Sequence, residues 1–307
     1  MSFVPGTPPR RVLQDAAGTG TVMAFAAMCC VQLGLAASVG LTGRLSAEGV
    51  GWLRLAWAAV IIVAVARPWK AGFAGRTVLL CAVLGVATAG MTLCFMLAVE
   101  RIALGTASAL EFLGPLSVAV VQGRGAARWW ALVAAAGVVC LTEPWHSTTD
   151  PAGVLFALGA AACWAVYVLL TQRAGDAVSG INALAISLPA AAVAATLVVG
   201  PATIARLDWQ LLALGFALAL LLPVVPFSLE LLALRRLTTA AFGTLMCLEP
   251  AIALLVGLAV LGQVPSPSAL AGIALVIAAG IGATRTGGRE PQRAAPKQRV
   301  TPLTRNQ

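Results

Sequence analysis

Charged residues are scarce in this 307-residue chain: Asp, Glu, Lys and Arg together make up 10% of it, whereas 60% of the residues are hydrophobic. Soluble domains contain about 25% charged residues, so this composition excludes an ordinary soluble globular protein. The 20 Lys and Arg outnumber the 11 Asp and Glu, but they fall in short loops and a terminal tail between apolar runs. That distribution is typical of membrane topology and does not indicate nucleic-acid binding.

Metal-binding and nucleotide-binding motifs are also missing. The single histidine, His146, lies in a polar segment, and the seven cysteines lie within apolar runs without metal-ligand spacing. The tripeptide GTG at 18–20 lacks the preceding strand and the Lys-Ser/Thr pair of a phosphate-binding loop. We therefore expect no metal, no cofactor and no catalytic residue. These absences exclude an ATP-driven pump and argue against a membrane-embedded enzyme.

Long apolar runs occupy most of the remaining sequence. A helix needs about 20 apolar residues to cross the hydrocarbon core of a bilayer, and no long polar domain separates the runs. We therefore predict an all-α integral membrane protein with ten transmembrane helices. The expected ranges are 20–41, 50–66, 77–98, 102–121, 129–142, 152–171, 181–200, 209–234, 238–261 and 267–284.

The positions of Lys and Arg predict how these helices are oriented. With a cytoplasmic N-terminus, 16 of the 20 fall on the cytoplasmic side and 3 on the outer side, while Arg54 lies within a helix. The positive-inside rule therefore places both termini in the cytoplasm. Residues 1–19 form a cytoplasmic N-terminal segment, and the basic, apolar-poor residues 285–307 form a disordered cytoplasmic tail.

Two stretches of the chain resemble each other at an offset of 135 residues, which aligns Pro250 with Pro115 and Arg236 with Arg101. This similarity predicts two five-helix repeats, over 20–142 and 152–284. Because five is odd, the second repeat enters from the opposite side. The repeats are then inverted, and a binding site is expected between them near the midplane. Chance similarity between two Ala- and Leu-rich stretches is the alternative.

Two glutamates, Glu111 and Glu249, lie near the middle of apolar segments and close to prolines. A carboxylate at bilayer depth costs about 2.5–3.5 kcal/mol on insertion scales. We expect these two side chains to line a polar cavity, where they carry protons or act as counter-ions for a substrate amine, because a carboxyl group in a dry site can exchange a proton near neutral pH. The alternative is a protonated glutamate that joins two helices.

The prolines predict interruptions in the same helices. Pro115 and Pro250 each leave the carbonyl four residues earlier without its helical hydrogen bond, at Glu111 and Met246. Such carbonyls persist in membranes where they face water, substrate or other side chains. At 100° per residue, one face of the first helix is expected to line the cavity. That face comprises Ser108, Glu111, Phe112 and Pro115.

Other polar and aromatic residues are further candidates for the cavity wall. Arg54 lies about one turn from the outer end of the second segment, where it either snorkels outward or recognises a carboxylate. Trp164 and Tyr167 form either a substrate-facing wall or core packing. Weaker candidates are Gln32, Thr88 and Thr92.

The segment 209–234 contains two prolines, Pro223 and Pro226, which make a hinge in this helix possible. Glu230 follows them, about one turn from the expected inner end. We interpret Glu230 as an interfacial structural residue.

With these features, the chain resembles the EamA-type transporters of the drug/metabolite transporter superfamily. The resemblance covers about 20–284 and is closest to the bacterial threonine/homoserine exporter group. It is carried by ALEFLGPL at 109–116, ACWAVYVL at 162–169, QRAG at 172–175 and PFSLELLALRRL through FGTLMCLEPA at 226–251. Arg54 in WLRLAW also resembles the family's arginine at the start of the second helix.

The resemblance implies a bacterial inner-membrane exporter of small amino acids that is driven by the proton gradient. It also implies that helices one to four and six to nine enclose the cavity, with five and ten at the periphery. The expected partners are a small-molecule substrate, protons and the lipid bilayer. Alternatives are a same-fold exporter or importer of drugs or other metabolites, a membrane-embedded enzyme and a passive channel.

Overall fold

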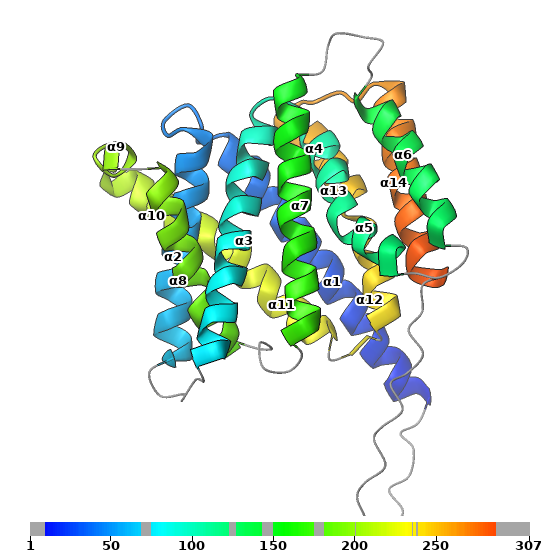
Figure 1. The fold of residues 1–307 in the computed structure, drawn as a ribbon, viewed down its shortest axis with the longest axis horizontal. Helices are drawn as coiled ribbons and strands as arrows, with labels where there is room; N and C mark the ends of the chain where they lie inside the picture. The colour runs from blue at the N-terminus through cyan, green and yellow to red at the C-terminus, as the bar shows by residue number, and fades with distance from the viewer. Residues whose placement is uncertain are drawn as a thin grey trace, which may run out of the picture.

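The computed structural model describes residues 10–68, 75–122, 127–142, 150–174, 181–199, 201–234, 236–237 and 239–286. All regular structure within these ranges is helical, without a strand. The helices form one bundle, in which α1 begins and α14 ends at the same end of the molecule (Figure 1). The predicted tail lies largely outside the described residues.

The helices of the first half coincide with the five predicted segments. They are α1 Arg10–Val39, α2 Ala47–Ala66, α3 Gly75–Val99, α4 Leu104–Glu111 with α5 Leu113–Gln122, and α6 Ala127–Thr142. The first helix differs at its start, because α1 includes polar residues that the prediction assigned to the segment 1–19. Hydropathy marks where an apolar run begins, whereas a helix can continue beyond the bilayer through residues such as those at 10–17.

The second half matches the prediction in the same way. Its helices are α7 Pro151–Ala174, α8 Ile181–Val199, the single turn α9 Pro201–Ile204, α10 Trp209–Ala219, the π-helix η3 Leu220–Val224, α11 Val225–Leu234, α12 Thr239–Met246, α13 Glu249–Leu261 and α14 Pro267–Thr286. Each predicted segment therefore contains helix, although three of the ten are divided into shorter pieces.

Six helical stretches in the described ranges are long and apolar enough to cross a membrane by length and composition. They are Gly18–Val39, Ala47–Ala66, Gly75–Val99, Pro151–Leu170, Trp209–Glu230 and Phe242–Leu261. Three apolar helices are shorter. Large apolar side chains point outward from the bundle, for example Leu79, Leu155 and Leu197, which are 66%, 69% and 82% exposed. Such a surface suits contact with acyl chains, and the chain is a multi-pass membrane protein.

The divided helices are interrupted near prolines. α4 ends at Glu111, and a turn at Phe112 leads into α5, which contains Pro115. α12 ends at Met246, and α13 begins at Glu249 with Pro250 in its first turn. These ends match the two carbonyls that the prolines were predicted to free. A third interruption lies at Leu222, whose backbone has φ −156° and ψ 111° beside Pro223.

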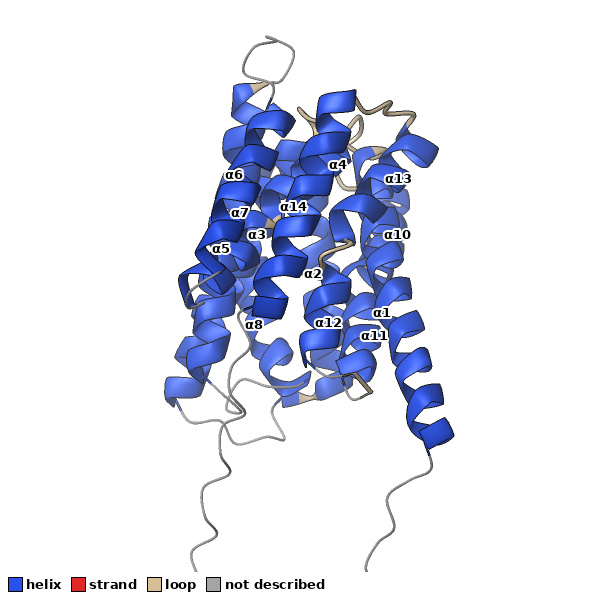
Figure 2. Cartoon of the chain, turned by 90° about the vertical axis from the view of Figure 1, so that its right-hand side faces the viewer, coloured by secondary structure: helices blue, strands red, loops and turns tan. Residues whose placement is uncertain are grey.

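Small residues allow the helices to approach closely. α3 packs against α7 and α8, α1 against α11, and α6 against α14 (Figures 1 and 2). A Cβ atom at Gly85 of α3 would collide with the carbonyl oxygen of Ser187 in α8, and one at Gly114 of α5 with that of Ala161 in α7. Without a hydrophobic driving force in lipid, such close contacts are a main source of helix association.

The α3–α8 contact gives a test of this packing. Gly85→Val is expected to destabilise the protein by about 1–3 kcal/mol, the usual cost of overpacking, because the colliding neighbour is rigid backbone. The measurement is the fraction of detergent-purified protein that stays monodisperse after heating. Gly75→Val on the same helix is the matched control, since a Cβ there meets nothing within 4 Å. Equal losses from both substitutions would contradict the packing argument.

Candidate functional site

A cavity of about 280 Å³ lies among the helices at the centre of the bundle. Its lining residues come from α1, α2, α3, α4, α7, α8, η3, α11, α12 and α13. α6 and α14 contribute none of these lining residues. The cavity is therefore enclosed by the eight segments that the family resemblance implied, with the fifth and tenth segments outside it.

The two predicted glutamates both line this cavity. Glu111 is the last residue of α4, and Glu249 is the first residue of α13, so each stands at a helix interruption. At Glu249 the start of the helix also places a carboxyl group near the positive end of the helix dipole. Gln32 of α1, which is 1% exposed, donates a hydrogen bond from Nε2 to Oε1 of Glu249 at 3.3 Å.

A third carboxyl group, Glu230 of α11, also lines the cavity. The sequence favoured an interfacial structural role for Glu230 over substrate contact, and its place in the lining set adds it to the groups that a substrate can meet. The π-helix and the nonhelical backbone at Leu222 redirect the segment that follows, so a count of turns from the helix end does not place its side chains. The neighbouring prolines at 223 and 226, which also line the cavity, were the signal that could have identified Glu230.

Arg54 of α2 is the basic residue of the cavity wall, and its side chain is buried, with 6% exposure. Its Nη1 donates to Oγ of Ser38 at 3.0 Å, and Ser38 in turn donates to the carbonyl of Gly34 at 2.6 Å. Nη1 also lies 3.7 Å from Sδ of Met96. The outward-snorkelling alternative is therefore wrong, because these contacts hold the guanidinium inside the bundle.

The charged groups of the cavity are electrostatic neighbours in a continuous series. Arg54 interacts with Glu111, Glu111 with Glu249, and Glu249 with Glu230. None of the ion pairs found among the described residues includes Arg54. Arg54 and the three carboxyl groups therefore line one cavity without an ion pair between Arg54 and another described residue, so a bound ion, an ammonium group or a proton can interact with each of them.

Aromatic and apolar side chains complete the wall. Trp164 and Tyr167 of α7 line the cavity, as do Met246 and Thr92. Phe112 lies behind Trp164, with ring centroids 6.4 Å apart and an interplanar angle of 76°, so it supports the indole edge-on. Residues on this wall that sequence reasoning did not single out are mainly apolar: Val31, Leu35, Leu55, Met91, Phe95, Leu188, Leu222 and Phe227.

Four residues that were predicted for the cavity wall are not among its lining residues: Gln32, Ser108, Phe112 and Pro115. Ser108 and Phe112 are buried, with 4% and 6% exposure. Pro250 also lies outside the lining set, and Gln32 reaches it through Glu249. Of the predicted face of Ser108, Glu111, Phe112 and Pro115, only Glu111 belongs to the lining set. The turn at Phe112 accounts for Pro115, since a helical wheel does not extend across an interruption, whereas Ser108 lies before the turn, in the same helix as Glu111.

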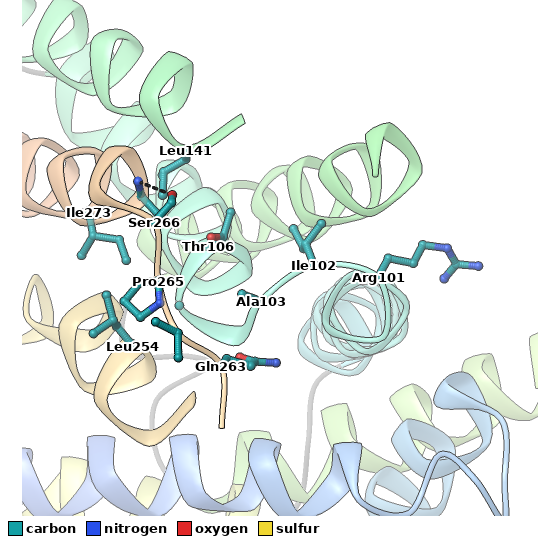
Figure 3. Close-up of a pocket in the computed structure, with 13 residues that line it drawn as sticks. Arg101, Ile102, Ala103, Thr106, Leu141, Leu254, Gln263, Pro265, Ser266 and Ile273 are labelled. Carbon is teal, nitrogen blue, oxygen red and sulfur yellow. Dashed lines mark hydrogen bonds between the residues drawn. The ribbon is translucent and has the colours of Figure 1, made fainter. Parts of the chain in front are cut away.

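A second pocket, of about 320 Å³, lies where the α3–α4 loop meets the loop between α13 and α14 (Figure 3). Gln263 spans this junction, accepting a hydrogen bond from the backbone N–H of Leu104 at 2.9 Å. Arg101 at the rim is already engaged by the carbonyl of Leu97, by Asp150 and by the ring of Phe156. No carboxylate belongs to its lining set, so this pocket does not share the charge arrangement of the central cavity.

Comparison with known proteins identifies the family. The profile of the EamA-like transporter family matches residues 151–284. The chain is 39% identical over 269 residues to the threonine/homoserine exporter RhtA of Salmonella typhimurium (strain LT2), covering 87% of this chain and 91% of the relative. It is also 39% identical over 273 residues to the exporter RhtA of Escherichia coli (strain K12), covering 88% and 92%. The chain belongs to the EamA-like transporter family.

Two further comparisons agree with this assignment. The uncharacterized transporter YwfM of Bacillus subtilis (strain 168) is 29% identical over 189 residues, or 57% of this chain and 60% of the relative. A crystal structure of a protein with 19% identity superposes with a TM-score of 0.56, covering 88% of this chain and 99% of that chain. At that identity the likeness shows the fold alone. This EamA-like transporter is thus RhtA-like within the drug/metabolite transporter superfamily.

Glu230 gives a test of the cavity in this EamA-like transporter. Glu230→Gln is expected to lower transport of labelled substrate several-fold, because it removes one negative charge from the series that faces the cavity. Initial rates in proteoliposomes that contain equal amounts of protein provide the measurement.

Glu100→Gln is the matched control, since Glu100 is exposed and interacts with Arg101 outside the cavity. If the Glu230→Gln protein transports substrate as fast as the Glu100→Gln protein, Glu230 has a structural role only.

Proposed function

We propose that this protein exports small amino acids such as threonine or homoserine, or related metabolites, from bacterial cells by exchange with protons. The observation that carries the proposal is the pair Glu111 and Glu249, which face one central cavity in a chain 39% identical to threonine/homoserine exporters. Carboxyl groups at such a depth are costly, and they are retained in membrane proteins mainly for ion or substrate pathways.

The size of the cavity favours a small substrate. Ligand pockets of drug-sized molecules have volumes of about 300–1,000 Å³, and the cavity of about 280 Å³ lies just below that range. A small amino acid fits this volume more readily than a multi-ring drug does.

The carboxyl groups also provide a route to proton coupling. A carboxylate in an apolar setting can neutralise its charge by accepting a proton or by binding an ammonium group, but one site cannot do both at once. Competition between the two ligands at Glu111 or Glu249 converts a proton gradient into substrate movement. Proton entry from the outside then releases the amine, and proton loss to the cytoplasm restores the site for the next substrate.

Helix packing supports ten transmembrane helices in two inverted repeats, over 20–142 and 152–284. Contacts occur in matching pairs when each segment is exchanged for the one five later. α3 packs on α7 as α1 packs on α11, and α3 packs on α8 as α2 packs on α10. The interruptions after α4 and α12 also correspond. In this arrangement both termini are cytoplasmic, and rocking of one repeat against the other exposes the cavity to each side in turn.

A second candidate substrate class is a larger organic cation, and the apolar wall favours it. Trp164, Tyr167, Phe95 and Phe227 line the same cavity as the carboxyl groups, and aromatic faces attract cations. Uptake of labelled threonine, homoserine and a hydrophobic amine into the same proteoliposomes separates the two classes. Transport of the amine with no transport of either amino acid would replace the first proposal.

Proton coupling gives a direct test. In proteoliposomes with an acidic lumen, the wild-type protein is expected to accumulate external threonine, and a protonophore is expected to abolish the accumulation. Glu111→Gln and Glu249→Gln are each expected to reduce the gradient-dependent rate at least about tenfold, because the amide neither exchanges a proton nor carries a charge; tenfold corresponds to about 1.4 kcal/mol.

Glu48→Gln is the control for these variants. Glu48 lies in the first turn of α2 and outside the cavity lining, and the substitution should leave the gradient-dependent rate unchanged. Full stimulation by the pH gradient in the Glu111→Gln and Glu249→Gln proteins would refute proton transfer at these residues.

A further inference from the structure

The guanidinium of Arg54 is fixed on one side only. Both of its hydrogen bonds use Nη1, one to Oγ of Ser38 and a weaker one to Sδ of Met96. Ser38 is fully buried, and it is oriented by its own bond to the carbonyl of Gly34 in the preceding turn of α1. α1 and α3 therefore set the position of the planar group at the cavity wall.

The other edge of the same group has no partner. Nε is buried without a hydrogen-bond partner, and neither hydrogen bond of the guanidinium uses Nη2. A guanidinium has five N–H donors, and the edge formed by Nε and Nη2 matches the two oxygens of a carboxylate. A buried cation without a paired anion is strongly unfavourable. The site therefore lacks one anionic, two-oxygen acceptor.

The protein does not supply that acceptor from its own side chains. Glu111 is the carboxylate that interacts electrostatically with Arg54, yet the two are not within the 4.0 Å of an ion pair among the described residues. Arg54 stands on α2, whereas Glu111 and Glu249 stand on α4 and α13. The cavity thus separates a positive site from a negative one, and a ligand that carries both charges can bind both.

We propose that Arg54, positioned by Ser38, binds the α-carboxylate of the substrate while the substrate ammonium group lies at Glu111 and Glu249. The cavity therefore selects amino acids with a free carboxylate and rejects amines of the same size. This inference rests on the proposed amino-acid export and adds the group by which the substrate is chosen. Ser38 is a positioning residue, since it acts through the guanidinium.

Competition against the wild-type protein tests the inference without any variant. Uptake of labelled threonine is measured in proteoliposomes with unlabelled threonine, threonine amide or 1-amino-2-propanol as competitor. The last two retain the amine and hydroxyl but lack the carboxylate. Each is expected to compete at least about thirtyfold less well than threonine. Equal competition by the amide and threonine would overturn the inference while leaving amino-acid transport intact.

Variants then assign the selectivity to Arg54. Arg54→Gln is expected to reduce threonine uptake at least about thirtyfold and to leave uptake of labelled threonine amide within about twofold, so that the ratio of the two rates falls towards one. Arg54→Lys keeps the charge but not the two-donor edge, and it should restore only part of the ratio. Arg206→Gln, at an exposed position outside the cavity, is the control.

The role of Ser38 predicts a different kinetic signature. Ser38→Ala should raise KM for threonine several-fold with little change in kcat, and the KM for threonine amide should not change. A structural role alone would alter both substrates alike. If the wild-type protein transports neither threonine nor homoserine, the proposed function fails first. If it transports threonine and its amide alike, only the carboxylate site fails.

Discussion

Every charged side chain within this bundle must be surrounded by something other than lipid, and the architecture follows from that constraint. Hydrocarbon offers neither hydrogen bonds nor water to a carboxylate or a guanidinium. The protein meets the requirement by turning Arg54, Glu111, Glu230 and Glu249 toward one central cavity. Large apolar side chains such as Leu155 and Leu197 cover the outside instead. The polar interior is small, so few helices need to be interrupted to build it.

The interruptions and the close packing depend on each other. A break in a membrane helix leaves backbone groups unpaired, and it persists only where neighbouring segments bury or bind them. Glu111 and Glu249 stand at two such breaks, where the chain turns and the side chain reaches the cavity. Around them, glycines such as Gly85 and Gly114 bring neighbouring helices into backbone contact. Closely packed helices thus surround the few positions at which a helix is interrupted.

Patterns within short stretches of sequence predicted the helices and their breaks. Contacts between residues that are distant in the sequence could not be predicted from it. Each of the ten segments that hydropathy marked contains helix within the described residues, and Pro115 and Pro250 located the ends of α4 and α12, because both effects act locally along the chain. Of the predicted cavity face, Ser108 and Phe112 are buried outside the lining set, which a helical wheel cannot reveal because it does not show what packs against each face.

The contact partners of individual side chains could not be predicted from the sequence either. Ser38 meets Arg54 only because α1 and α2 pack side by side, and Glu230 reaches the cavity only because the backbone is redirected at Leu222. The ten-helix count and the inverted repeat remain proposals, which the paired contacts support.

The mixture of charges in the cavity bears on how transport is coupled. A zwitterion brings one positive and one negative charge, so its binding leaves the total charge of the cavity unchanged. A proton adds one positive charge.

Exchange of a zwitterionic substrate for a proton therefore changes the total charge of the cavity. It requires one carboxylate that can bind either the substrate ammonium group or the proton. With Arg54 occupied by the substrate carboxylate, Glu111 is the acidic residue whose charge acts on Arg54. Proton binding at Glu111 would remove one of the two charges that hold the amine and so weaken substrate binding, which favours release. An arginine alone would bind anions without regard to pH, and carboxylates alone would bind any amine. The proposed selectivity and the proposed coupling thus need both kinds of group across one cavity.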